Sequence, residues 1–146
     1  MAEEHHEGGF TVSTDPSRLD LDVIHGFLTR SYWSEGITRA LVDRSIENSL
    51  CFGLYEGRKQ IGFARVVADR AVIGFLADVF VLEPWRGRGL GKFLMRCVMA
   101  HPDLQTISKF RLGTRDAHGL YRPFGFTALE DPATHMERMR PELRRG

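Results

Sequence analysis

Residues 81–91 have the sequence VLEPWRGRGLG and join an apolar stretch to an amphipathic one. Three glycines in it, Gly87, Gly89 and Gly91, let the backbone approach a ligand closely and adopt positive φ angles. Apolar side chains then recur at helical spacing over residues 88–100, so the turn opens a helix whose first N–H groups and dipole favour an anion. The stretch therefore predicts a strand-to-helix turn that binds an anion, with a diphosphate as the preferred ligand.

Three patterns compete for this turn. A P-loop needs GxxxxGK[ST], but Gly91-Lys92 is followed by Phe93 and not by a hydroxyl for magnesium. A dinucleotide fingerprint needs GxGxxG, whereas the chain has GxGxG and no preceding βαβ unit. The pattern Arg-x-x-Gly-x-Gly is met by Arg86, Gly89 and Gly91. A glycine-rich turn without any ligand is the remaining alternative.

The whole chain predicts a single α+β domain over residues 1–146, with residues 1–9 as a flexible tail. The expected strands are 10–14, 50–55, 60–67, 71–82, 110–114 and 126–129, with a further one at 134–137. The expected helices begin at Asp20, Thr38, Arg88 and Asp116. The phenylalanines expected in the core are Phe52, Phe63, Phe75, Phe93 and Phe110.

Composition excludes several classes of protein. Hydrophobic residues make up 42% of the chain and charged residues 27%, which is ordinary globular composition. The net charge of +1 predicts no nucleic-acid partner, and the arginines near the C-terminus are interpreted as a solvated tail. The sequence contains no recognisable signal peptide or membrane segment, and its two cysteines do not form the pattern of a disulfide framework. A cytoplasmic location is therefore expected. His5 and His6 could bind a metal weakly, but a solvated tail is the preferred interpretation and no metal site is predicted.

A second motif, AHGLYRPFGF, occupies residues 117–126. It predicts a short helix with Tyr121 that ends at Gly125 with a positive φ. Together with the Arg86 turn, this motif resembles the GNAT superfamily of N-acetyltransferases. The resemblance implies a mixed, mostly antiparallel sheet of six to seven strands flanked by about four helices. It also implies that the fourth and fifth strands are splayed around acetyl-CoA.

The resemblance implies a role for each matching residue. The backbone at Phe80 and Val81 would bond the pantetheine arm beside a bulge, and Tyr121 would protonate the departing thiolate. The residues that fall on the pyrophosphate loop are Arg86, Gly87, Arg88, Gly89, Leu90, Gly91 and Lys92. Many family members have asparagine seven residues before the tyrosine, where this chain has Thr114. Thr114 departs from that pattern, and its hydroxyl is the group left there to form a hydrogen bond with the cofactor.

Acetyl transfer to an alkylammonium requires removal of a proton. Asp78 is the candidate base, because it is the one charged residue in the apolar stretch 71–82. Alternatively it binds the ammonium, or it pairs with an arginine such as Arg115. In this family the loop between the first two helices often walls the acceptor pocket, so Tyr32, Trp33 and Glu35 are assigned to that pocket, together with Arg115. Core packing is the alternative for the aromatic residues.

The sequence thus predicts direct acetyl transfer from acetyl-CoA to a primary amine of a small molecule or peptide. A covalent enzyme intermediate is disfavoured, because no histidine is placed to activate Cys51 or Cys97. His118 is interpreted as a surface residue and Asp116 as a helix cap. The alternatives are a module that binds acetyl-CoA without catalysis and a transferase of another acyl group. Exposed strand edges make a homodimer plausible.

Overall fold

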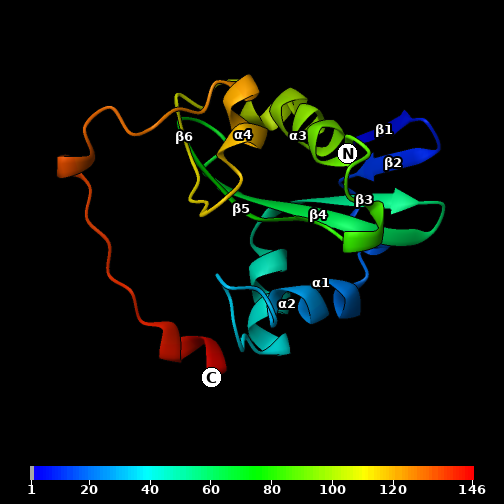
Figure 1. The fold of residues 1–146 in the computed structure, drawn as a ribbon, viewed down its shortest axis with the longest axis horizontal. Coiled ribbons are helices and arrows are strands. Elements are labelled where there is room, and N and C mark those ends of the chain that lie inside the picture. Colours follow the sequence, from blue (N-terminus) through cyan, green and yellow to red (C-terminus); the bar gives the residue numbers. More distant parts are fainter. Residues whose placement is uncertain (1) are drawn as a thin grey trace.

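The computed structural model describes residues 2–146 and has one sheet with helices on both of its faces (Figure 1). The strands are β1 (Glu4–Glu7), β2 (Phe10–Ser13), β3 (Leu50–Glu56), β4 (Lys59–Ala68), β5 (Ile73–Val81) and β6 (Lys109–Arg111). The helices are α1 (Leu21–Leu28), α2 (Arg39–Glu47), α3 (Leu90–Ala100) and α4 (His118–Tyr121). Helices α3 and α4 lie on one face, and α1 and α2 lie on the other.

The sheet has the order β1-β2-β3-β4-β5-β6 and is mostly antiparallel. Only β5 and β6 are parallel, and they pair over Ile73–Phe75 and Lys109–Arg111. Strand β5 continues to Val81, so its second half has no strand on the β6 side among residues 2–146. This confirms the predicted α+β class with two strands splayed beside the glycine turn.

Local signals explain most of the boundaries. The Asp20 carboxylate accepts from the N–H groups of Asp22 and Val23, and the Thr38 hydroxyl accepts from that of Leu41, so both predicted helix caps are confirmed. Gly57 has a φ of 60° in the turn that joins β3 to β4. These caps and turns need only neighbouring residues, which is why the sequence predicts them.

Two groups of buried side chains form the core. One lies between the sheet and α3, and it includes Phe52, Val66, Leu76, Leu94 and Val98. The other lies under α1 and α2 on the opposite face, and it includes Ile24, Leu28, Val42, Phe63 and Phe80. The sheet is thus covered on both faces, so it forms a rigid support for the turn after β5. None of the helices in residues 2–146 has the length and apolar character needed to cross a bilayer.

The expectation of a flexible tail is wrong for residues 4–7, which form β1. This strand pairs with β2 through a turn at Gly8 and Gly9, whose φ angles are 55° and 84°. Arg18 and Arg96 bind the carboxylates of Glu4 and Glu7 at 2.9 and 2.7 Å. The acidic residues that suggested a solvated tail therefore bind arginines of the folded body.

The strands expected at residues 126–129 and 134–137 are absent from the structure, in which residues 132–134 form a short 3₁₀ turn. Phe126 instead packs edge-on against Phe110 and Tyr121, with ring centroids 5.6 and 6.1 Å apart. Its β-prone neighbours find no strand partner, since the sheet ends at β6. Side-chain packing rather than strand pairing thus fixes Phe126.

Candidate active site

The glycine turn has the geometry expected of an anion site. Gly87 and Gly89 have φ angles of 79° and 76°, and Gly89 is the N-cap of α3 without any side-chain cap. A Cβ at either position would meet no atom within 4 Å, so space for a ligand lies beside the backbone. At Gly91 a Cβ would lie 3.4 Å from a Leu120 methyl group, so this glycine allows α3 to approach α4 closely. The first N–H groups of α3 are therefore free to bind an anion.

The two arginines of the turn differ in position. Arg86 donates from Nε to the carbonyl oxygen of Val81 at 2.8 Å, and it lines the groove described below. Arg88 and Lys92 are exposed, and neither lines that groove. Local positive charge at the groove therefore comes mainly from Arg86 and the helix N-terminus.

Strand β5 is interrupted by a bulge at Asp78. Phe63 pairs with Phe80 and Arg65 pairs with Ala77, so two residues of β5 lie opposite one residue of β4. Asp78 has a φ of 55°, which is rare outside glycine. The bulge lies in the part of β5 beyond the pairing with β6. The Phe80 ring is buried and stacked on Phe27 with ring centroids 4.0 Å apart, so at this position the backbone is left to contact a ligand.

The Asp78 carboxylate is held by two partners. Oδ1 accepts from the indole N–H of Trp33 at 2.9 Å, and Oδ2 accepts from Nε of Arg65 at 2.8 Å. Arg65 also donates to the hydroxyl of Ser49 at 3.1 Å. The arginine that pairs with Asp78 is therefore Arg65 and not Arg115, the partner suggested by the sequence.

Tyr121 is the last residue of α4 and is almost fully buried. Burial raises the pKa of Tyr121 to about 12, with smaller contributions from Tyr32 and Asp116. A 3₁₀ turn (Arg122–Phe124) follows α4 and ends at Gly125, whose φ of 91° confirms the predicted stop. The phenol therefore keeps its proton throughout the physiological pH range.

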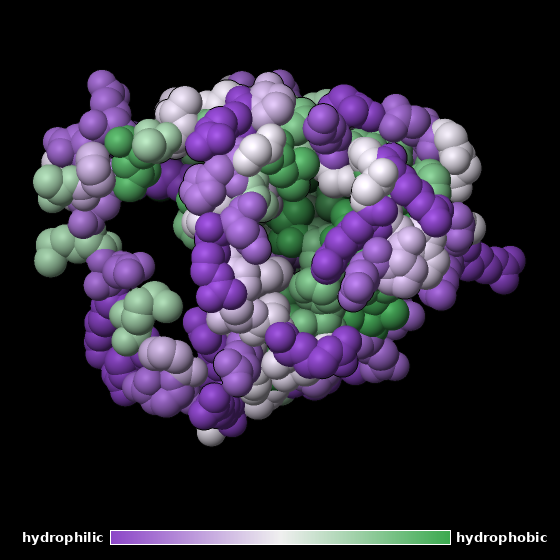
Figure 2. Space-filling view, in the orientation of Figure 1, coloured by the Kyte–Doolittle hydropathy of each residue, from purple (hydrophilic) through white to green (hydrophobic). Residues whose placement is uncertain are grey.

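Two cavities meet at Tyr121. The first, here called the glycine groove, has a volume of about 600 Å³ and runs from Arg86 and Gly87 along residues 79–81 to Tyr121. The second, here called the bulge pocket, has a volume of about 400 Å³ and is lined by Trp33, Asp78 and Tyr121 among others. Figure 2 shows apolar surface gathered in a central hollow, with hydrophilic side chains around it. A long ligand in the groove and a small one in the pocket would thus touch at Tyr121.

Three of the four residues expected around the acceptor lie at the bulge pocket. Tyr32 and Trp33 line both cavities, and Arg115 lines the bulge pocket alone. The Tyr32 hydroxyl accepts from the Arg115 N–H at 3.0 Å, and the Arg115 guanidinium lies 3.8 Å from the centroid of the Tyr32 ring. Glu35 is exposed and lines neither cavity. The aromatic residues thus join the loop after α1 to the segment before α4.

The residue that caps the start of α4 is not the one expected from the sequence. The Thr114 hydroxyl accepts from the N–H of Ala117 at 3.0 Å, whereas Asp116 makes no side-chain cap. Thr114 lines the bulge pocket, and Asp116 lines both cavities. The Asp116 carboxylate is exposed and has no hydrogen-bond or ion-pair partner among residues 2–146. Asp116 is therefore a candidate functional residue that the sequence reasoning missed.

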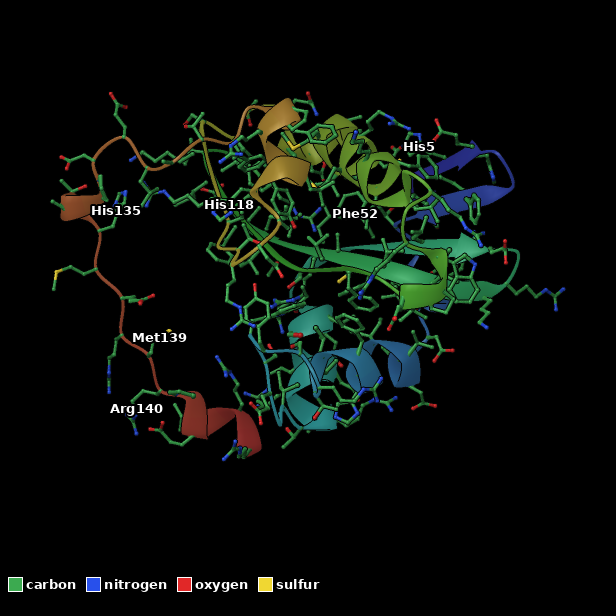
Figure 3. All side chains as sticks on the ribbon, in the orientation of Figure 1. His5, Phe52, His118, His135, Met139 and Arg140 are labelled. Carbon is green, nitrogen blue, oxygen red and sulfur yellow. The ribbon has the colours of Figure 1, made fainter. Side chains whose placement is uncertain are left out.

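Two apolar residues of the bulge pocket were also missed. Phe75 was expected in the core, but half of its surface is exposed and it borders the pocket. Met139 reaches the pocket from the C-terminal segment, which carried no sequence signal for a binding site. His118 lies at the surface beside β6, as expected (Figure 3).

Neither cysteine is suited to be a nucleophile. Burial raises the pKa of the Cys51 thiol to about 12 and that of the Cys97 thiol to about 11. The thiolate is the reactive form of cysteine, and almost none of it exists at neutral pH under these conditions. No group of histidine, cysteine, aspartate and glutamate able to hold a metal ion occurs in residues 2–146.

The splayed sheet, the glycine turn at a helix N-terminus and the buried tyrosine between two cavities are the features that the resemblance to GNAT N-acetyltransferases implied. Residues 47–128, more than half of the chain, match the family model described as "Acetyltransferase (GNAT) domain". The chain therefore belongs to the GNAT acetyltransferase family.

Similar proteins agree with this assignment. A solved structure of a GNAT-family protein from Xanthomonas campestris pv. campestris is 48% identical, with a TM-score of 0.91 over 95% of this chain and 99% of that one. A Clostridium acetobutylicum protein solved with acetyl-CoA is 15% identical, with a TM-score of 0.62 over 94% of this chain and 100% of that one. That second likeness shows the fold alone.

A curated relative from Gibberella zeae, named putative acetyltransferase FG08082, is 28% identical over 109 residues. The match covers 61% of this chain and 62% of that relative, so the chain spans less than two thirds of the length of that relative.

Proposed function

We propose that the protein transfers the acetyl group of acetyl-CoA directly to the nitrogen of a primary amine. The observation that carries this proposal is the position of Tyr121, where the glycine groove meets the bulge pocket. In this proposal the groove holds the donor and the pocket holds the amine. The compartment of the protein is proposed to be the cytoplasm, as the sequence suggested.

Several features of the groove support acetyl-CoA as its ligand. Arg86 and the N–H groups that follow Gly89 suit a pyrophosphate, and the open edge of β5 at residues 79–81 suits the amide groups of the pantetheine arm. The Thr114 hydroxyl keeps a free proton after it accepts from Ala117, so it can still donate to a ligand. When bound, acetyl-CoA supplies an activated thioester.

Tyr121 acts on the departing sulfur. An alkyl thiol is a stronger acid than a phenol with a pKa of about 12, so Tyr121 donates a hydrogen bond to the sulfur and does not itself ionise. A C–N bond forms and the C–S bond breaks, while the phenol stabilises the negative charge that develops on sulfur. The buried thiols of Cys51 and Cys97 support a transfer without an enzyme-bound acetyl group.

The proton released by the amine is assigned to Asp116. Both oxygens of Asp78 already bind Trp33 and Arg65, so we infer that Asp78 is a positioning residue for the bulge. Asp116 lines both cavities and its carboxylate has free lone pairs. Asp116→Asn should therefore lower kcat at pH 7 about a hundredfold and leave the Kd for acetyl-CoA unchanged, whereas Asp78→Asn should lower kcat much less. The reverse result would make Asp78 the base.

The proposal is tested with purified protein, acetyl-CoA and a panel of primary amines, by measurement of free thiol and of the acetylated product. Thiol release that depends on an amine supports N-acetyl transfer. Propionyl-CoA and butyryl-CoA in parallel show whether acetyl is the preferred acyl group. Acetyl-CoA binding without any amine-dependent thiol release would support the non-catalytic module instead, and absence of binding would overturn both.

A further inference from the structure

The C-terminal segment, here called the arm (residues 130–146), forms no strand with the rest of the molecule. Figure 1 shows that it leaves the α4 side of the sheet, passes around the β6 edge and reaches the side of α1 and α2. Figure 2 shows open space between the middle of the arm and the body. Met136 on the arm is 98% exposed. The middle of the arm thus stands apart from the body.

The far end of the arm is fixed to the loop that walls the bulge pocket. The N–H of Thr38 donates to the carbonyl oxygen of Arg144 at 3.0 Å. The Arg145 side chain lies against Gly36, with Nε 3.0 Å from the place that a Cβ at Gly36 would occupy. The same loop carries Tyr32 and Trp33, so the arm and the two aromatic walls belong to one connected structure.

Two apolar side chains border the bulge pocket, one from β5 and one from the arm. Phe75 projects from β5 with 50% of its surface exposed, and Met139 projects from the arm with 59% exposed. Figure 3 shows Met139 and Arg140 on the arm, in the stretch that leads to its anchored end. Exposed apolar side chains that border one cavity are typical of a ligand site, and methionine adapts its shape to a ligand.

We propose that the arm is the third wall of the acceptor site, and that the acceptor amine carries an apolar group that packs between Phe75 and Met139. This inference rests on the proposed N-acetyl transfer. The charges around the pocket do not favour a polyamine, because Asp78 is already paired with Arg65 and the one remaining carboxylate, that of Asp116, is matched by the positive charge of Arg115. An apolar amine thus gains burial that a small polar amine cannot gain.

The chain offers a matched pair of variants. Met139 lines the pocket, whereas Met136 is on the same arm but lies outside it. With acetyl-CoA as donor, the wild-type protein should have a higher kcat/KM for phenethylamine than for ethanolamine. Met139→Ala should reduce this preference about tenfold, as expected from the loss of one apolar contact surface, and Met136→Ala should leave it unchanged. The affinity for acetyl-CoA should be equal in all three proteins.

The two proposals fail in different ways. If the wild-type protein acetylates both amines but Met139→Ala and Met136→Ala behave alike, the arm is no part of the site and the present inference is overturned. A wild-type protein that prefers ethanolamine also overturns it. If neither these amines nor the panel release thiol, the proposed function itself has failed. Hydrogen exchange at the Thr38 amide then tests the arm alone, since exchange as fast as in an unfolded peptide would show that the arm is not anchored.

Discussion

Trp33 donates its indole N–H to Oδ1 of Asp78 at 2.9 Å and so ties the loop after α1 to the bulge in β5. Asp78 adopts a positive φ of 55°, a conformation that costs an L-residue roughly 1–2 kcal/mol. Arg65 binds the other carboxylate oxygen from β4. These two hydrogen bonds offset the strain and fix the bulge where the two cavities meet.

The ion pair between Arg65 and Asp78 is expected to stabilise the fold, so the losses of stability caused by removing each partner should not add. Both side chains are largely buried, and removal of one partner leaves a charge without compensation. Arg65→Met and Asp78→Asn should each lower the free energy of unfolding by about 3 kcal/mol, and the double variant should lower it by clearly less than their sum. Urea denaturation of the four proteins measures this coupling. Strictly additive losses would show that the pair contributes nothing of its own.

The two arginines of the glycine turn should contribute unequally to donor binding. Arg86 lines the glycine groove, while Arg88 is exposed outside it. Arg86→Gln should raise the Kd for acetyl-CoA about tenfold through loss of a charge-assisted contact, and Arg88→Gln should raise it much less. Calorimetric titration with acetyl-CoA distinguishes them. Equal effects of the two changes would mean that the turn acts only through its overall charge.

The turn and Tyr121 could be predicted from sequence because their signals are local. Positive φ at Gly89 and Gly125 and the caps at Asp20 and Thr38 depend on residues a few positions apart. Local hydrogen bonds and backbone preferences suffice to define them.

The walls of the bulge pocket could not be predicted because they arise from distant contacts. Trp33 and Asp78 are 45 residues apart, and nothing local marks Arg65 as the partner of Asp78. Met139 lies in a stretch whose composition indicates only a solvated tail, and the exposure of Phe75 depends on which parts of the sheet the rest of the chain covers. β1 was missed for a similar reason, since its arginine partners lie elsewhere in the chain.

His101 should make stability depend on pH. Burial lowers the pKa of His101 below its ordinary value of 6.5, and its Nδ1 accepts from the N–H of Asp103 at 3.1 Å. Between the lowered pKa and 6.5 the unfolded chain binds more protons, so this contribution to stability is complete above pH 6.5 and is lost as the pH falls. His101→Asn keeps an acceptor for Asp103 but does not titrate.

The free energy of unfolding of the wild type should therefore fall from pH 7.5 to pH 5.5 more steeply than that of His101→Asn. Denaturant titrations at several pH values provide the measurement. His118→Asn, a change at the surface, is the control and should follow the wild type. Parallel curves for the wild type and His101→Asn would show that other groups cause the dependence.

Tyr121→Phe should separate catalysis from donor binding. The change keeps the ring that packs against Phe126 and removes only the hydroxyl, so kcat should fall about a hundredfold while the Kd for acetyl-CoA stays within about twofold. Because the pKa of Tyr121 is raised to about 12, the phenol remains protonated up to pH 10, where a free tyrosine is half ionised. The kcat of the wild type should therefore show no loss between pH 8 and pH 10. A decline centred near pH 9–10 that is absent from Tyr121→Phe would mean that the phenol ionises in that range and is not the buried donor that the structure describes.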